Sequence, residues 1–190
     1  EDLDRCYEST PRHPYMVALQ RTIRVFDMAR EPFQKLIQAN RMDQVATRYA
    51  TYSDLEDYCR HSANPVGHMV LYACGYRDEE RQHLSDATCT ALQLANFWQD
   101  VSRDFSIGRI YIPTEDMERF GYTEEQLACG VVNDRFRSLM AFEVDRTRAL
   151  FRRGLGLIDR LDGTLKLDVA LFSQGGMALL EAIERQDFDV

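Results

Sequence analysis

The chain has 190 residues, of which 45% are hydrophobic, so it is long enough to bury one core. Its net charge of -8, from 31 acidic and 23 basic residues, excludes a general attraction to nucleic acid or to anionic lipid. The five cysteines form no C-x-x-C pair, so we expect reduced thiols and a cytoplasmic protein. No apolar run reaches the roughly 18 residues of a membrane span. We expect residues 1–190 to form a single domain.

Helical periodicity dominates the first part of the chain, and alternating strand patterns hardly appear. Helices are expected over residues 1–7, 15–26 and 31–40. The next helix is expected to begin with Ser53 as its N-cap, because Glu56 three residues later completes a capping box.

The helix that starts near Ser53 meets the pair Asn64-Pro65 and resumes as far as Tyr72. Proline inside a helix removes a backbone donor, so a kink is expected near residues 61–63. A plain helix end followed by a second helix is the alternative.

The second half of the chain is also helical in pattern. Residues 80–105 are predicted to form one long helix, followed by an irregular segment over residues 107–113. Thr114 and Thr123 are expected to cap short helices. Further helices are expected over residues 133–154 and 168–186, the second broken at Gly175-Gly176. Only an all-α fold agrees with these patterns.

One narrow face of the predicted long helix is polar while its other directions are apolar. Gln93, Asn96, Asp100 and Asp104 fall within an arc of roughly 80° on that face. Two carboxylates one turn apart repel each other unless a cation lies between them. Mg²⁺ takes oxygen ligands and is usually shared with substrate phosphates. The face therefore predicts a diphosphate site with Mg²⁺ at Asp100 and Asp104, and a solvated carboxylate pair is the alternative.

Arg109 and Tyr111 follow these carboxylates within one loop and could fold back towards them. Arginine suits a bidentate contact with phosphate, and a tyrosine hydroxyl can donate to the same group. A surface arginine is the alternative for Arg109. Tyr58 lies on the helix that enters the predicted kink, where packing in the core is its simplest interpretation.

Two stretches of the chain resemble the squalene/phytoene synthase family. Residues 93–104 with 108–113 resemble its second aspartate-rich motif, and residues 58–67 resemble the segment that precedes this motif and lines the pocket. The resemblance covers nearly the whole chain, including residues 143–151. The sequence of residues 62–67 is most similar to that of the hydroxysqualene synthase branch of bacterial hopanoid biosynthesis.

The resemblance implies an all-α isoprenoid synthase fold with a central cavity and an aspartate-rich motif on each of two facing helices. Each motif is expected to bind Mg²⁺ that holds the diphosphate of a prenyl donor. The implied roles are metal binding by Asp100 and Asp104, diphosphate contact by Arg109 and Tyr111, a place near the reacting carbons for Tyr58, and a pocket wall formed by Gln93 and Asn96.

The hydroxysqualene branch implies that presqualene diphosphate is ionised and that water traps the rearranged cation, without NADPH. Squalene, presqualene diphosphate or phytoene is the product of other members, and a non-catalytic assembly protein on the same fold is a further alternative. The implied partners are the prenyl diphosphate substrate and the other enzymes of the squalene and hopanoid pathway. Release of the oily product implies peripheral contact with the inner membrane.

The chain departs from the family pattern in two ways. The first aspartate-rich motif is absent, so we expect residues 1–190 to be a partial, incomplete synthase domain that is inactive alone. In some relatives a basic residue directly precedes the first aspartate of the second motif, whereas Gln99 stands there in this chain. A phosphate contact is therefore not predicted at that position.

Overall fold

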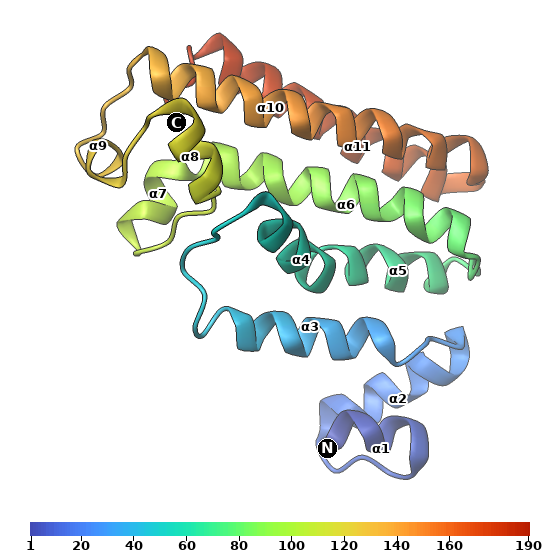
Figure 1. Ribbon diagram of the computed structural model, residues 1–190. Helices are drawn as coiled ribbons and strands as arrows, with labels where there is room; N and C mark the ends of the chain where they lie inside the picture. The colour runs from blue at the N-terminus through green and yellow to red at the C-terminus, as the bar shows by residue number, and fades with distance from the viewer.

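The computed structural model describes residues 1–190 as helices joined by short loops, without a strand, and confirms the all-α prediction (Figure 1). None of the helices combines the length and the apolar character needed to cross a membrane. The helices are α1 (Asp2–Glu8), α2 (Pro14–Phe26), α3 (Glu31–Met42), α4 (Tyr52–Ser62), α5 (Asn64–Ala73), α6 (Glu79–Gln99), α7 (Val101–Ser106), α8 (Thr114–Phe120), α9 (Glu124–Ala128), α10 (Asp134–Gly154), the 3-10 helix η1 (Leu155–Arg160) and α11 (Gly163–Arg185).

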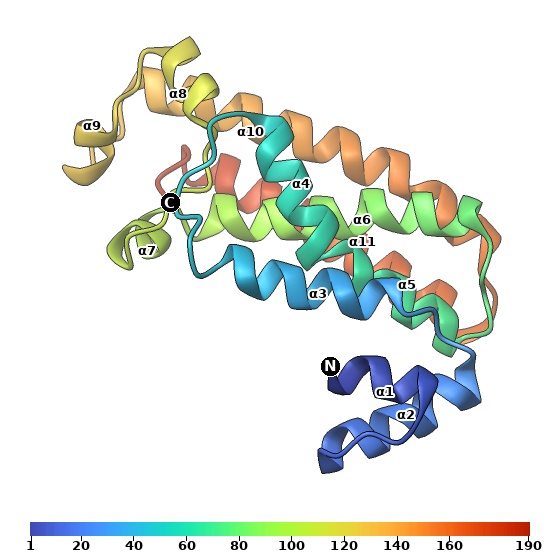
Figure 2. The same ribbon diagram turned by 60° about the horizontal axis from the view of Figure 1, so that its bottom comes forward.

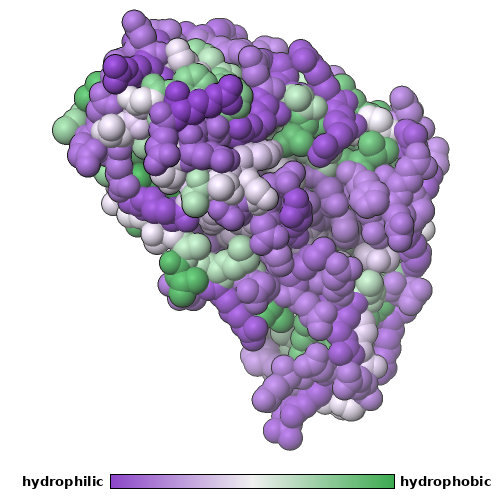
Figure 3. Space-filling view, in the orientation of Figure 1, coloured by the Kyte–Doolittle hydropathy of each residue, from purple (hydrophilic) through white to green (hydrophobic).

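Helix α6 lies at the centre of the bundle. It packs against α10 and α11 on one side and against α4 and α5 on the other (Figure 1). Trp98 and Leu94 of α6 are fully buried in the main core. The face shown in Figure 3 is mostly hydrophilic, with small separate hydrophobic patches. The apolar residues of this acidic chain are therefore gathered around α6, which also carries the predicted polar face.

The helix break before Pro65 is sharper than a kink. Helices α4 and α5 are separated by Ala63 alone, and their change of direction is visible in Figure 2. The predicted alternative, one helix that ends and a second that begins, therefore describes the structure. The proline stands in the first turn of α5, where its missing N–H removes no helical hydrogen bond.

The predicted cap of α4 was wrong by two residues. Thr51 is the N-cap, and its hydroxyl accepts from the backbone N–H of Asp54 at 3.2 Å while the Asp54 carboxylate accepts from the Thr51 N–H at 2.9 Å. The stretch contains two overlapping capping-box patterns, so local sequence cannot choose between them. The first one forms, and beside it the backbone N–H of Tyr52 donates to the carboxylate of Glu115, which ties the start of the helix to α8.

The predicted long helix over residues 80–105 is interrupted at Asp100, whose backbone leaves the helical region at φ -101° and ψ 18°. The spacing of the polar face nevertheless persists. The N–H of Asp100 donates to the carbonyl of Asn96 at 3.0 Å, and the N–H of Asp104 donates to the carbonyl of Asp100 at 2.7 Å. Asp100 thus joins α6 to the short helix α7 and keeps the two carboxylates one turn apart.

The caps predicted in the second half were correct at one of two threonines. Thr123 caps α9 in a capping box with Gln126. Thr114 is instead the first residue of α8, and Pro113 before it provides no side-chain cap. The backbone N–H of Thr114 is satisfied by the carbonyl of Tyr49 at 2.9 Å, so a tertiary contact replaces the cap.

The predicted break at Gly175-Gly176 does not occur, because α11 is continuous from Gly163 to Arg185. Gly176 is buried, and a Cβ atom placed there would collide with the ring of the fully buried Phe151 on α10. The glycine therefore permits close packing of two helices and does not terminate one. Gly175 faces open space.

This difference predicts opposite stability effects for two adjacent substitutions. Gly176→Ala should lower the free energy of unfolding by about 1–3 kcal/mol, because Phe151 must move in a packed core. Gly175→Ala should raise it by about 0.5–1 kcal/mol, because alanine has the lower entropy cost in a helix. Urea unfolding of the two variants checks this. Equal effects of the same sign would contradict the packing explanation.

Candidate functional site

The polar face of α6 ends beside the segment 107–113, which returns towards it. Gly108 has φ +82°, a conformation that glycine adopts without steric cost, and it turns the chain at the end of α7. The backbone N–H of Arg109 then donates to the carbonyl of Asp104 at 2.9 Å. Asp104, Arg109 and Tyr111 line one small cavity of about 10 Å³. The structure therefore places the predicted phosphate-contacting residues next to the second predicted metal ligand.

Segment 107–113 also pairs with the loop that joins α3 to α4. The N–H of Ile110 donates to the carbonyl of Thr47 at 3.0 Å, and the Arg48 guanidinium donates to the carbonyl of Gly108 at 2.7 Å. This pairing brings the C-terminal end of α3 to the candidate site, although the two segments lie about sixty positions apart in the sequence.

Asp43, just after the end of α3, contacts two of the site's side chains and was not predicted. The Tyr58 hydroxyl donates to its Oδ1 at 2.9 Å, and the Arg109 guanidinium donates to the same oxygen at 3.4 Å and to the Asp43 carbonyl at 3.3 Å. Arg109 also donates to the hydroxyl oxygen of Tyr111 at 2.9 Å. Asp43 therefore fixes Tyr58 and Arg109 relative to each other.

The two site tyrosines belong to a buried aromatic cluster. Tyr111 stacks on Phe97 with ring centroids 3.7 Å apart, and the Tyr58 ring lies 6.2 Å from the Tyr111 ring and 5.6 Å from the Tyr49 ring. Burial raises the pKa of Tyr58, and its hydrogen bond to Asp43 raises it further. Burial also raises the pKa of Tyr111, although Arg109 opposes this. Both hydroxyls thus remain protonated donors at physiological pH.

The prediction that Tyr58 packs in the core is confirmed, since only 5% of the residue is exposed. Its hydroxyl nevertheless points to a charged partner at the site. The place near reacting carbons that the family resemblance implies for Tyr58 stays a prediction.

Asp100 and Asp104 form a pair with too little positive charge around it. Burial raises the pKa of Asp104, and the neighbouring Asp100 carboxylate raises it further, while Arg109 and Arg103 lower it. Arg103 lies 3.9 Å from Asp100, but its side chain is 80% exposed. Two carboxylates that share a negative site in this way suit a divalent cation.

The structure limits what a metal ion could bind here. No cluster of three or more His, Cys, Asp or Glu side chains is suitable for a metal. A Mg²⁺ ion at Asp100 and Asp104 would therefore complete its coordination with water and phosphate oxygens, as Mg²⁺ usually does. Metal binding by this carboxylate pair stays a prediction.

Gln93 and Asn96 occupy the same side of α6, about two turns and one turn before Asp100. Gln93 is half-buried and Asn96 is exposed, and neither side chain makes a hydrogen bond within the protein. Their amides are free to contact a ligand along this face, so their predicted role as a pocket wall is compatible with their position.

An apolar cavity of about 170 Å³ continues this face of α6 towards its N-terminal end. On α6 it is lined by Ser85, Cys89 and Leu92, whose spacing of four and three residues continues to Asn96 and Asp100. Burial raises the pKa of the Cys89 thiol to about 11, so this side chain is a neutral apolar wall. The rest of the lining comes from α5, η1, α11 and one further residue of α6: Val66, Gly67, Val70, Leu71, Thr88, Leu157, Leu165, Val169 and Phe172.

One helix face therefore joins an apolar cavity to a carboxylate pair. From Ser85 to Asp100 the distance along the helix axis is about 22 Å. The cavity is smaller than the roughly 300–1,000 Å³ of typical ligand pockets, so these walls enclose only part of a large ligand. A molecule with an anionic head and a long apolar tail matches this arrangement.

Comparisons with known proteins identify the family to which this chain is similar. The sequence profile described as squalene/phytoene synthase matches residues 1–190. The chain is 35% identical to the 15-cis-phytoene synthase of Synechocystis sp. and 32% identical to that of Synechococcus elongatus, with 99% of this chain covered in each case. It spans only 59% and 65% of the lengths of these two curated relatives.

Two solved structures are similar over 98% of the chain. The squalene synthase HpnC from Alicyclobacillus acidocaldarius matches with a TM-score of 0.96 and 45% identity, and 71% of that chain is covered. A dehydrosqualene synthase in complex with a ligand matches with a TM-score of 0.89 and 25% identity, and 66% of that chain is covered. The isoprenoid synthase fold that the sequence predicted is thus confirmed.

Proposed function

This chain belongs to the squalene/phytoene synthase family, and from that premise we propose that it forms the diphosphate-binding half of a pocket in which prenyl diphosphates are joined head to head. The observation that carries the proposal is the single face of α6 that runs from the apolar cavity to Asp100 and Asp104. A prenyl diphosphate has the same two parts, an oily chain and an anionic head.

More specifically, we propose the step that follows this joining: presqualene diphosphate loses its diphosphate and takes up water to give hydroxysqualene, with Mg²⁺ and without NADPH. The 45% identity to a squalene synthase, compared with 35% to a phytoene synthase, supports this choice. Phytoene is the second candidate product, because two phytoene synthases are similar over 99% of the chain.

The side chains of the site suit departure of the diphosphate. Mg²⁺, when bound, would neutralise charge on the leaving group. Arg109 holds its guanidinium between Asp43 and Tyr111, so it can donate to a phosphate oxygen without reorganising. The Tyr111 hydroxyl is a neutral donor beside it. The apolar walls of the cavity would lie against the carbon chain and help to keep water from it, which would protect a cation from premature quenching.

A product assay tests the proposal. The full-length protein is incubated with Mg²⁺ and farnesyl, presqualene or geranylgeranyl diphosphate, each with and without NADPH. Hydroxysqualene formed from farnesyl or presqualene diphosphate without NADPH is the expected result. Squalene formed only with NADPH would overturn the hydroxysqualene assignment, and phytoene from geranylgeranyl diphosphate would favour the second candidate. No product from any substrate would favour a non-catalytic assembly protein.

A further inference from the structure

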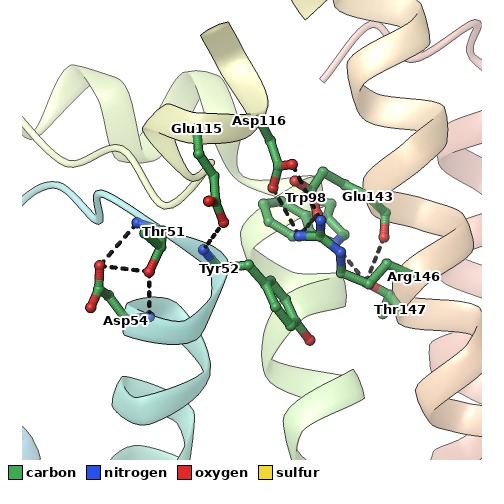
Figure 4. A network of polar contacts seen from close by, with 9 residues as sticks. All are labelled: Thr51, Tyr52, Asp54, Trp98, Glu115, Asp116, Glu143, Arg146 and Thr147. Carbon is green, nitrogen blue, oxygen red and sulfur yellow. Dashed lines mark hydrogen bonds and ion pairs between the residues drawn. The ribbon is translucent and has the colours of Figure 1, made fainter. Parts of the chain in front are cut away.

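A buried polar cluster outside the diphosphate site contains two carboxylates and one guanidinium (Figure 4). Arg146 of α10 binds Asp116 of α8 through both of its terminal nitrogens, at 2.9 and 3.2 Å. The same Arg146 lies 3.2 Å from Oε2 of Glu143. Glu143 is fully buried and Asp116 is 4% exposed. One positive charge therefore faces two buried acids.

Charge balance in this cluster favours a neutral Glu143. Asp116 already uses both terminal nitrogens of Arg146, and Oε1 of Glu143 has no hydrogen-bond partner at all. An ionised Glu143 would leave one uncompensated buried charge, which is costly. Burial raises the pKa of Glu143 to about 8; Arg146 lowers it, whereas Asp116 and Glu115 raise it.

The groups that surround Glu143 come from three elements. On α10 they are Arg146 itself and Thr147, whose hydroxyl donates to the Glu143 carbonyl at 2.8 Å and accepts from the indole N–H of Trp98 on α6 at 2.7 Å. On α8 they are Glu115 and Asp116. On α4, the centroid of the Tyr52 ring lies 4.0 Å from Cζ of Arg146. Burial raises the pKa of the Tyr52 hydroxyl to about 12. Among these groups, Arg146 alone carries a positive charge.

The cluster is connected to both segments that build the candidate site. Asp116 lies in the first turn of α8, directly after segment 107–113, which carries Arg109 and Tyr111. Tyr52 begins α4, directly after the loop that follows Asp43. Figure 4 shows the two chain segments meeting where the Tyr52 N–H donates to Glu115, with Arg146 beside them. Arg146 thus holds both segments to α10.

We propose that Glu143 is a positioning residue of the candidate site that carries a proton while the site is assembled. The neutral carboxyl leaves Arg146 to Asp116 and Tyr52. When Glu143 loses its proton, it competes with Asp116 for the guanidinium, and α8 and the segment before it loosen. The consequence for catalysis rests on the proposed function, whereas the structural consequence does not.

The direction of the pH effect follows from proton linkage. In an unfolded chain Glu143 ionises near its ordinary value of 4.5, and in the folded protein it ionises at about 8. Between pH 4.5 and about pH 8 the folded state therefore binds one more proton than the unfolded chain. The contribution of Glu143 to the free energy of unfolding falls as pH rises through this range and is constant above it. Glu143→Gln removes the proton equilibrium and should remove this dependence.

Amide hydrogen exchange tests the proposal without any substrate. The N–H groups of Ile110 and Thr114, which donate to the facing loop, report on segment 107–113. Their protection factors should fall at least about tenfold between pH 5 and pH 8 in the wild-type full-length protein and stay constant in Glu143→Gln. Asp145→Asn, an exposed change two positions away, should behave as wild type. The same loss of protection in Glu143→Gln would overturn the proposal.

Two further measurements separate possible outcomes. If Glu143→Gln does not fold, Asp116→Asn replaces it: Arg146 is then free to pair with an ionised Glu143, so the loss of protection should no longer occur near pH 8. An unchanged transition in Asp116→Asn would equally overturn the proposal. If the proposed reaction is observed, kcat/KM should decline above about pH 8 in wild type and not in Glu143→Gln. If no reaction is observed, the proposed function fails, but the hydrogen-exchange result still tests the role of Glu143.

Discussion

Replacing either Asp100 or Asp104 by alanine is expected to lower turnover of the full-length protein at least about 100-fold. Each carboxylate supplies one of the two protein ligands with which we propose this face holds Mg²⁺ and the departing diphosphate. Loss of one preformed electrostatic contact of this kind typically costs 100- to 1,000-fold in rate. Steady-state kinetics over a range of Mg²⁺ concentrations checks the effect, and higher Mg²⁺ should recover part of it.

Asp104→Ala should leave stability unchanged or slightly improved. Asp104 is partly buried beside a like charge, and this is why its pKa is raised. Its negative charge therefore does not stabilise the folded state at neutral pH. Asp159→Ala, at an exposed position without an ion pair, provides the matched control for both rate and urea midpoint. Near-normal rates in both site variants would refute the metal role.

The helices could be predicted because their apolar periodicity is strong, but their exact joints could not. Asp100 interrupts the long helix without any glycine or proline, so no residue type in the sequence marks this joint. Gly175-Gly176 misled in the opposite direction. Glycine was interpreted as a helix breaker, whereas Gly176 is required by the ring of Phe151 on another helix.

Asp43 could not be connected to the site from the sequence, because a loop pairing brings it there. One local signal existed. Asp43 occupies the C-cap of α3, where the helix dipole disfavours negative charge. An acid at an unfavourable helix end, explained by no local contact, indicates a distant partner, and here the partners are Tyr58 and Arg109. Glu143 lay inside a stretch that resembles the family, but only the structure shows that it is fully buried.

Asp43→Ala is expected to lower kcat/KM about 10- to 100-fold. It removes the acceptor that holds the Arg109 guanidinium, and hydrogen bonds to charged groups contribute about 1.5–3 kcal/mol each. It should also cost about 1–3 kcal/mol of stability, since the buried Tyr58 hydroxyl loses its partner. Thermal unfolding and steady-state kinetics measure the two effects separately.

A second substitution distinguishes positioning from packing at Asp43. In the double variant Asp43→Ala, Tyr58→Phe, no hydroxyl is left unpaired, so most of the lost stability should return. Activity should not return, because Arg109 still lacks its carboxylate partner and Tyr58 still lacks its hydroxyl. Recovery of both quantities together would mean that Asp43 serves only to satisfy a core tyrosine. Recovery of stability with an activity below that of Tyr58→Phe alone would place Asp43 among the groups that orient Arg109, with which we propose the site binds diphosphate.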